Sequence, residues 1–97
     1  MSYQLTNEAA QDLEAILLDG MSRFGIPVAI DYHQKLFQVF SLLAQFPEMS
    51  RERVELTPPV RIHPVGSHII IKHLQANQDI LIVRVRHAHE DWLSNPI

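Results

Sequence analysis

Basic and histidine side chains recur at alternate positions of the segment from Val60 to Asp91, where they could present acid–base or anion-binding chemistry. Imidazoles titrate near neutral pH, and guanidinium groups bind carboxylates through paired hydrogen bonds. Because strand side chains alternate between two faces, three strands in this segment would carry these groups on one face. The expected basic face consists of Arg61, Lys72, Arg84 and Arg86, accompanied by His63 and His68. The sequence thus predicts a sheet that presents chemistry on one side.

The opposite face of these strands is expected to be the hydrophobic core. In the last strand Leu81 and Val83 occupy one set of alternate positions, and Arg84 and Arg86 occupy the other. The same alternation divides the residues of the two earlier strands. The residues assigned to the core are Val60, Ile62, Ile69, Ile71, Leu81, Val83 and Val85. The apolar residues assigned to the outer face are Ile70, Ile80 and Ile82.

The polar groups of the basic face also have ordinary structural interpretations, and both interpretations stay open. Arg84 and Arg86 either recognise an acidic partner or belong to a solvated face. His63 and His68 are either acid–base residues or partly exposed side chains that pack beside isoleucines.

Metal binding is not expected, although His87 and His89 have a two-residue spacing that would place both on one face of a strand. Such a site would need a third ligand. The chain contains no cysteine, which excludes disulfides, thiol nucleophiles and thiolate metal sites. We therefore expect neither a metal nor a cofactor.

Length and charge limit the class of protein. Ninety-seven residues with 46% hydrophobic content fit a single domain, residues 1–97. Residues 1–48 carry a net charge of −4 and residues 49–97 carry +1, which is not the broad basic surface of a protein that binds duplex DNA through phosphate contacts. Neither a signal peptide nor an apolar run of membrane-spanning length is recognisable, so we expect a cytoplasmic protein that does not contact membranes.

Local signals predict an α+β fold in which a helical hairpin packs on a small, mainly antiparallel sheet. A short edge strand at residues 3–5 precedes a helix that Thr6 or Asn7 caps and that ends near Gly25. A second helix starts near Pro27 and stops before Pro47. Residues 47–59 are expected to be a surface connection, followed by three strands with turns at residues 65–67 and 76–78.

The order and spacing of several short motifs resemble the ParE toxins, a branch of the RelE/ParE superfamily, over nearly the whole chain. These motifs are Tyr3-x-Leu5, Ala10-x-Asp12-Leu13, Phe24-Gly25, Pro47, Arg61-x-x-Pro64-x-Gly66-Ser67-His68 and Ile82-x-Arg84-Val85-x-His87-x-x-x-Asp91. The resemblance implies a toxin of a type II toxin–antitoxin module, of the kind associated with plasmid stabilisation. It further implies that the free toxin inhibits DNA gyrase and blocks replication, and that a cognate ParD-like antitoxin neutralises it.

The resemblance also implies how partners bind. An antitoxin segment that is disordered when free would place apolar side chains in a groove by the helical hairpin. The side chains expected to receive it are Leu13, Leu17, Tyr32, Leu36 and Phe40. The partners expected are this antitoxin and DNA gyrase, without sequence-specific DNA binding by the toxin alone. A homodimer and a toxin–antitoxin hetero-oligomer are both compatible with the resemblance to ParE toxins.

Two other functions stay open. The first is a ribosome-dependent mRNA endonuclease of the RelE type, whose catalytic residues would be Arg61, His68, Arg84 and His87, with Asp91 orienting His87. The second is a non-toxic relative that only binds antitoxin. The His87 to Asp91 ending favours the ParE branch, so inhibition by binding is preferred and no catalytic residue is assigned.

Departures from the ParE pattern bear on the choice of target. Lys72 stands where the family often has an aromatic residue, and Pro59 stands where it often has glycine. The ending is short, with Trp92 and Leu93 available for contact.

Overall fold

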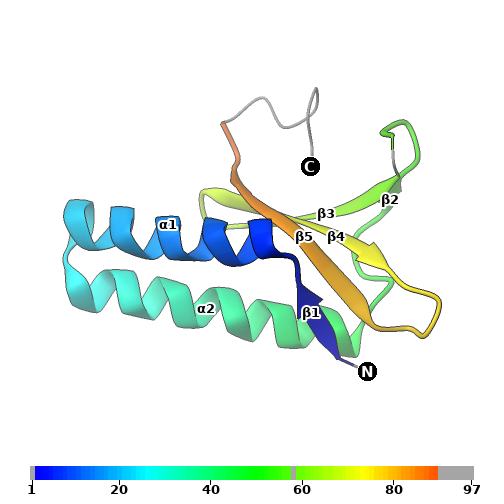
Figure 1. Cartoon of the computed structure of the whole chain (residues 1–97), viewed down its shortest axis with the longest axis horizontal. Helices are drawn as coiled ribbons and strands as arrows, with labels where there is room; N and C mark the ends of the chain where they lie inside the picture. Colours follow the sequence, from blue (N-terminus) through cyan, green and yellow to red (C-terminus); the bar gives the residue numbers. More distant parts are fainter. Residues whose placement is uncertain (1, 58, 90–97) are drawn as a thin grey trace.

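Two antiparallel helices pack against one face of a five-stranded sheet in the computed structural model, which describes residues 2–57 and 59–89 (Figure 1). The expectations for Asp91, Trp92 and Leu93 lie outside the described residues. The elements are β1 (Tyr3–Leu5), α1 (Asn7–Phe24), α2 (Ile26–Gln45), β2 (Glu52–Arg53), β3 (Val60–Val65), β4 (His68–Leu74) and β5 (Ile80–His87). The predicted α+β architecture is confirmed.

The helix boundaries follow the local signals in the sequence. The Thr6 hydroxyl caps α1 by accepting a hydrogen bond from the Ala9 amide at 3.0 Å. Gly25, with φ of 91°, lets the chain reverse between the helices. Pro27 occupies the first turn of α2, and the helix ends two residues before Pro47. These ends set the length of the hairpin.

The sheet has the strand order β1-β5-β4-β3-β2. The predicted edge strand β1 lies parallel to β5, with Tyr3 opposite Ile80, and the other neighbours are antiparallel. The segment expected to be only a surface connection contains β2, which pairs Glu52 with Arg61. A two-residue strand is too short to produce a recognisable alternation, which explains why sequence analysis missed it.

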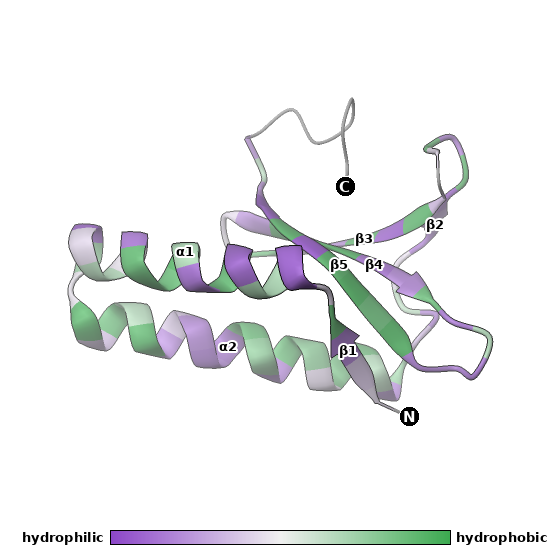
Figure 2. Cartoon of the chain, in the orientation of Figure 1, coloured by the Kyte–Doolittle hydropathy of each residue, from purple (hydrophilic) through white to green (hydrophobic). Residues whose placement is uncertain are grey.

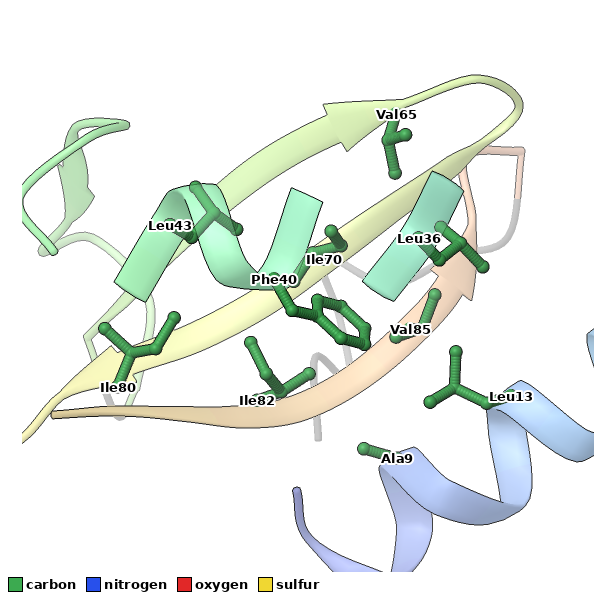
Figure 3. Packing of buried hydrophobic residues seen from close by; sticks show 10 residues of the cluster. All are labelled: Ala9, Leu13, Leu36, Phe40, Leu43, Val65, Ile70, Ile80, Ile82 and Val85. Atoms are coloured by element: carbon green, nitrogen blue, oxygen red, sulfur yellow. The ribbon is translucent and has the colours of Figure 1, made fainter. Parts of the chain in front are cut away.

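The main core lies between α2 and the sheet. Phe40 and Leu36 of α2 lie over Ile70, Ile82 and their neighbours, as the close view shows (Figure 3). Hydrophobic residues run along β5 and in patches along α2 (Figure 2). The core cluster comprises Ala9, Leu13, Leu36, Phe40, Leu43, Val65, Ile70, Ile80, Ile82 and Val85.

The predicted assignment of apolar residues to the two sheet faces was wrong for all of them except Val85. Ile70, Ile80 and Ile82, expected outside, belong to the core cluster with α2. A second buried cluster, which Leu56, Ile62 and Leu81 contact, contains the residues that had been assigned to the main core: Val60, Ile69, Ile71 and Val83. Both faces of these strands are therefore apolar, and alternation alone could not decide which face meets the helices.

A bulge in β5 explains why Val85 is the exception. Ile71 lies opposite Arg84, whereas the next residue, Lys72, lies opposite Ile82, so Val83 is an extra residue in β5. Such a bulge interrupts the strict alternation of faces. Val85 consequently joins the main core although Val83 does not.

Candidate functional site

A groove of about 600 Å³ lies between the distal half of the helical hairpin and the turn that joins β3 to β4. Its walls are mostly small or apolar side chains of α1 and α2. The lining residues are Ala15, Ile16, Asp19, Gly20, Arg23, Phe24, Val28, Ala29, Tyr32, Gly66, Ser67, His68 and His87. An apolar cavity with a few polar groups at one end is a typical site for a bound segment or ligand.

Tyr32 connects the floor of the groove to the β3–β4 turn. Its hydroxyl lies 2.7 Å from His68 Nδ1 and donates to the Val65 carbonyl at 3.2 Å. Burial raises the pKa of Tyr32 above its ordinary value of 10.0, so the hydroxyl keeps its proton at neutral pH. Gly66 has φ of 55°, and a Cβ there would lie 2.7 Å from this hydroxyl. Tyr32 therefore lies directly against the turn.

Three imidazoles lie in a row where β4 begins and β5 ends. The rings of His68 and His87 meet edge to face with centroids 5.2 Å apart, and those of His87 and His89 are also 5.2 Å apart. The structure thus brings together two of the four candidate nuclease residues. Within residues 2–57 and 59–89, no group of three or more carboxylates and imidazoles could hold a metal ion.

Arg84, another candidate nuclease residue, forms an ion pair inside the protein. Its Nε and Nη2 donate to the two carboxylate oxygens of Asp12 on α1, at 2.7 and 2.9 Å. The Val85 amide also donates to Asp12, at 3.0 Å. Arg84 thus has the acidic partner that its chemistry predicted, but the partner belongs to the same chain.

Arg61 and Lys72 lie opposite each other on β3 and β4. Lys72, expected on an open basic face, has no exposed surface, and that expectation was wrong. Its ammonium donates to the Met49 carbonyl at 2.7 Å. Burial and the neighbouring Arg61 lower the pKa of Lys72 to about 8. Arg61 donates to the Ser50 carbonyl at 2.7 Å.

The four arginine and lysine residues of the expected basic face therefore do not make one open surface. Arg61 and Lys72 hold the segment after α2, Arg84 holds α1, and Arg86 is half-buried on β5. Arg61 lies opposite Lys72, four residues along β4 from His68, which corresponds to about 13 Å of strand. Arg61 is accordingly separated from His68 and His87, and Arg84 lies between these two positions along the sheet, opposite Ile71.

The residues expected to receive an antitoxin fall into two groups. Leu13, Leu36 and Phe40 lie in the core, with 3%, 0% and 0% of their surface exposed. Tyr32 lines the groove, and Leu17 is half-buried on α1. In this conformation a partner can reach Tyr32 and Leu17, while the other three shape the hairpin from beneath.

Sequence analysis missed the apolar surface at the distal end of the hairpin. Phe24, Ile26 and Val28 are 68%, 57% and 54% exposed, and Leu18 is 57% exposed. Large apolar side chains on both sides of the Gly25 turn were a usable signal, because soluble monomeric proteins rarely expose several large apolar side chains next to one another. This surface borders the groove at Phe24 and Val28.

Comparisons with known proteins agree with these features. Residues 3–92 match the model of the family described as "ParE toxin of type II toxin-antitoxin system, parDE". The toxin ParE3 of Caulobacter vibrioides is 28% identical over 80 residues, which are 82% of this chain and 79% of that protein. A chain of the chromosomal ParDE toxin–antitoxin system from P. aeruginosa has the same fold, with a TM-score of 0.79, 23% identity, and coverage of 92% of this chain and 97% of that chain. Among the described residues, no helix is long and apolar enough to cross a membrane.

Proposed function

We propose that this chain, which belongs to the ParE toxin family of type II toxin–antitoxin systems, inhibits DNA gyrase in the cytoplasm when it is free. A ParD-like antitoxin neutralises it. Family membership over residues 3–92 is the observation that supports this proposal. The contribution of the geometry is to favour inhibition by binding over catalysis.

The positions of the basic residues favour binding over catalysis. Cleavage of RNA requires an acid, a base and a cation around one phosphate. Arg61 and Arg84 are engaged with backbone carbonyls and with Asp12, and Arg61 lies at the opposite end of the sheet from His68. A substrate phosphate beside His68 would therefore lack Arg61. Inhibition of a target by binding does not require these side chains to meet at one phosphate.

The groove at the distal end of the hairpin is the proposed antitoxin site. Its walls include Ala15, Ile16 and Val28, which suit the apolar face of a segment that folds on binding. Tyr32 and His68 supply polar groups at the floor. Covering Phe24 would also remove a large exposed apolar side chain from water.

A gyrase assay and a translation assay, run on one preparation of the purified chain, test the proposed target. We expect the chain to block supercoiling or to trap cleaved DNA, and we expect this effect to depend on ATP. Translation should remain normal. A ParD-like antitoxin added in equimolar amount should restore gyrase activity, and heat-denatured chain serves as the control. Intact gyrase with cleaved message would overturn the proposal and make Arg61, His68, Arg84 and His87 catalytic candidates. No effect in either assay would point to a relative that only binds antitoxin.

A further inference from the structure

Four consecutive backbone carbonyls that follow α2 are bound by two cations of the sheet. Lys72 Nζ donates to the carbonyls of the first and third residues of the segment 47–50, at 3.4 and 2.7 Å. Arg61 Nη1 donates to those of the second and fourth, at 2.9 and 2.7 Å. The segment 47–50, called here the strap, therefore lies over both cations.

The strap does not neutralise the charge beneath it. Lys72 has no exposed surface, and its acceptors within the described part of the chain are carbonyls rather than carboxylates. The charged groups that influence it are Arg61 and His63 on β3, and both interactions are repulsive when all are protonated. Buried charges are normally paired with an opposite charge, because carbonyl dipoles compensate desolvation only in part.

Arg61 has an unused hydrogen-bonding edge. Its contacts use Nη1, while its buried Nε has no partner among the described residues. Arg84 shows what this edge binds in the same protein, because its Nε and Nη2 hold both oxygens of Asp12. A planar oxyanion is therefore the complement of the unused edge of Arg61.

The strap is held in a conformation that costs free energy. Ser50 has φ of 73°, in the left-handed region that residues other than glycine seldom adopt. A hydrogen bond of 2.8 Å between Ser50 Oγ and His63 Nδ1 helps to hold it there. Displacing the strap would release this strain, which makes displacement easier than for an unstrained segment.

We propose that Lys72 and Arg61 form a binding site for a carboxylate, and that the strap covers this site in the free protein. The strap carbonyls bind Nη1 of Arg61 and the ammonium of Lys72, and they leave the Nε–Nη2 edge of Arg61 without an acceptor among the described residues. An incoming carboxylate would occupy the Nε–Nη2 edge of Arg61 and neutralise Lys72. The ligand is an acidic side chain of a partner protein, as the Asp12–Arg84 pair of this chain exemplifies. A nucleic acid is disfavoured, because its polyanionic backbone would be repelled more strongly by the net charge of −3.

Arginine-selective NMR of the full-length chain tests the site with defined probes. Sodium acetate is titrated against the Arg61 Nε–H resonance at constant ionic strength, with sodium chloride as the control. We expect a saturable shift with acetate and none with chloride. An acetate response no larger than the chloride response would overturn the site, and tighter binding of inorganic phosphate would overturn its assignment to carboxylates.

Two further measurements test the roles of Lys72 and the strap. Lys72→Met keeps the apolar stem and should weaken acetate binding at least about tenfold, whereas Arg51→Gln, an exposed position beside the strap, should not change it. Lys72→Arg should restore binding, which separates loss of charge from loss of folding.

Saturating acetate should also accelerate hydrogen exchange of the Met49 amide, which donates to the Phe46 carbonyl at 2.9 Å in the free protein. Unchanged exchange at Met49 would overturn the role of the strap as a cover.

Discussion

The carboxylate of Asp12 on α1 is bound on both oxygens by the guanidinium of Arg84 on β5. The same carboxylate accepts from the Val85 amide, and Thr6 Oγ1 donates to the Val83 carbonyl at 2.7 Å. These contacts fall where β5 continues beyond its pairing with β1, which ends at Ile82. The N-terminal part of α1 thus supplies the hydrogen bonds that a longer β1 would have made.

Asp12→Ala is expected to lower the free energy of unfolding by about 2 kcal/mol, because it removes the carboxylate that accepts hydrogen bonds from the half-buried Arg84 guanidinium and from the Val85 amide. Side-chain exposures of 24% and 16% place this pair well inside the solvent boundary. Urea denaturation measures the loss. The matched control is Asp19→Ala, whose partner Arg23 is 68% exposed and whose loss should be at most about 0.5 kcal/mol. Equal losses for the two variants would contradict this account.

Apart from the two-residue strand β2, the elements of this fold were predictable from local residues, but the faces of the sheet were not. Thr6, Gly25 and Pro47 act through their own backbone chemistry, so they mark helix ends wherever they stand. Ile70 and Ile71 differ in nothing that a sequence displays, and only the packing of α2 against the sheet places Ile70 in the main core. The bulge at Val83 then moved Val85 to the same side.

The candidate site was predictable only in part, for a similar reason. His68 and His87 came together because the two-residue turn after Val65 fixes the register of β4. The burial of Lys72 depends on the path of residues 47–50, which have no periodic pattern. Hydrophobic alternation carries no information about an irregular segment that crosses a sheet.

Gly66→Ala is expected to displace Tyr32, whereas Gly25→Ala is not. Both glycines have positive φ, so both variants carry a backbone penalty of about 1 kcal/mol or more. That penalty is larger at Gly25, because its φ of 91° and ψ of 163° lie in a region that essentially only glycine adopts. At Gly66 the new Cβ would lie 2.7 Å from the Tyr32 hydroxyl, whereas at Gly25 it meets nothing within 4 Å. The His68 resonances report the displacement, and thermal denaturation measures the loss of stability. Unchanged His68 resonances in Gly66→Ala would refute the close contact with Tyr32.

Stability should rise with pH between about 8 and 10.5 because of Lys72. Its pKa is about 8 in the folded state and 10.5 ordinarily, so the unfolded chain binds more protons throughout this window. The rise attributable to Lys72 is at most about 3 kcal/mol. Urea denaturation of the wild type and of Lys72→Met across this window isolates the effect, because other groups titrate in both proteins. Parallel curves for the two proteins would show that Lys72 is not perturbed.

Val28→Asp is expected to abolish capture of the antitoxin without affecting folding. Val28 lines the groove and is 54% exposed, so a charge there costs little in the free chain but would be buried by a bound apolar segment. Co-purification with a co-expressed ParD-like antitoxin measures capture. Val54→Asp, at a position 71% exposed outside the groove lining, should retain capture. Normal capture by Val28→Asp would move the antitoxin site away from the groove.

Leu36→Ala and Leu17→Ala should separate packing in the core from contact with the antitoxin, the role that the sequence predicted for both leucines. Leu36 has no exposed surface, so its truncation leaves a cavity beside Phe40 and should lower the free energy of unfolding by about 3 kcal/mol. Leu17 is half-buried on α1, so Leu17→Ala should lower the free energy of unfolding by less than about 1.5 kcal/mol.

If the antitoxin contacts the hairpin surface, Leu17→Ala should weaken binding of the antitoxin, as measured by calorimetry at a temperature where both variants remain folded. Leu36→Ala should then bind normally, because its side chain acts beneath that surface. A binding defect confined to Leu36→Ala would mean that the antitoxin opens the core, so that the hairpin moves away from the sheet in the complex.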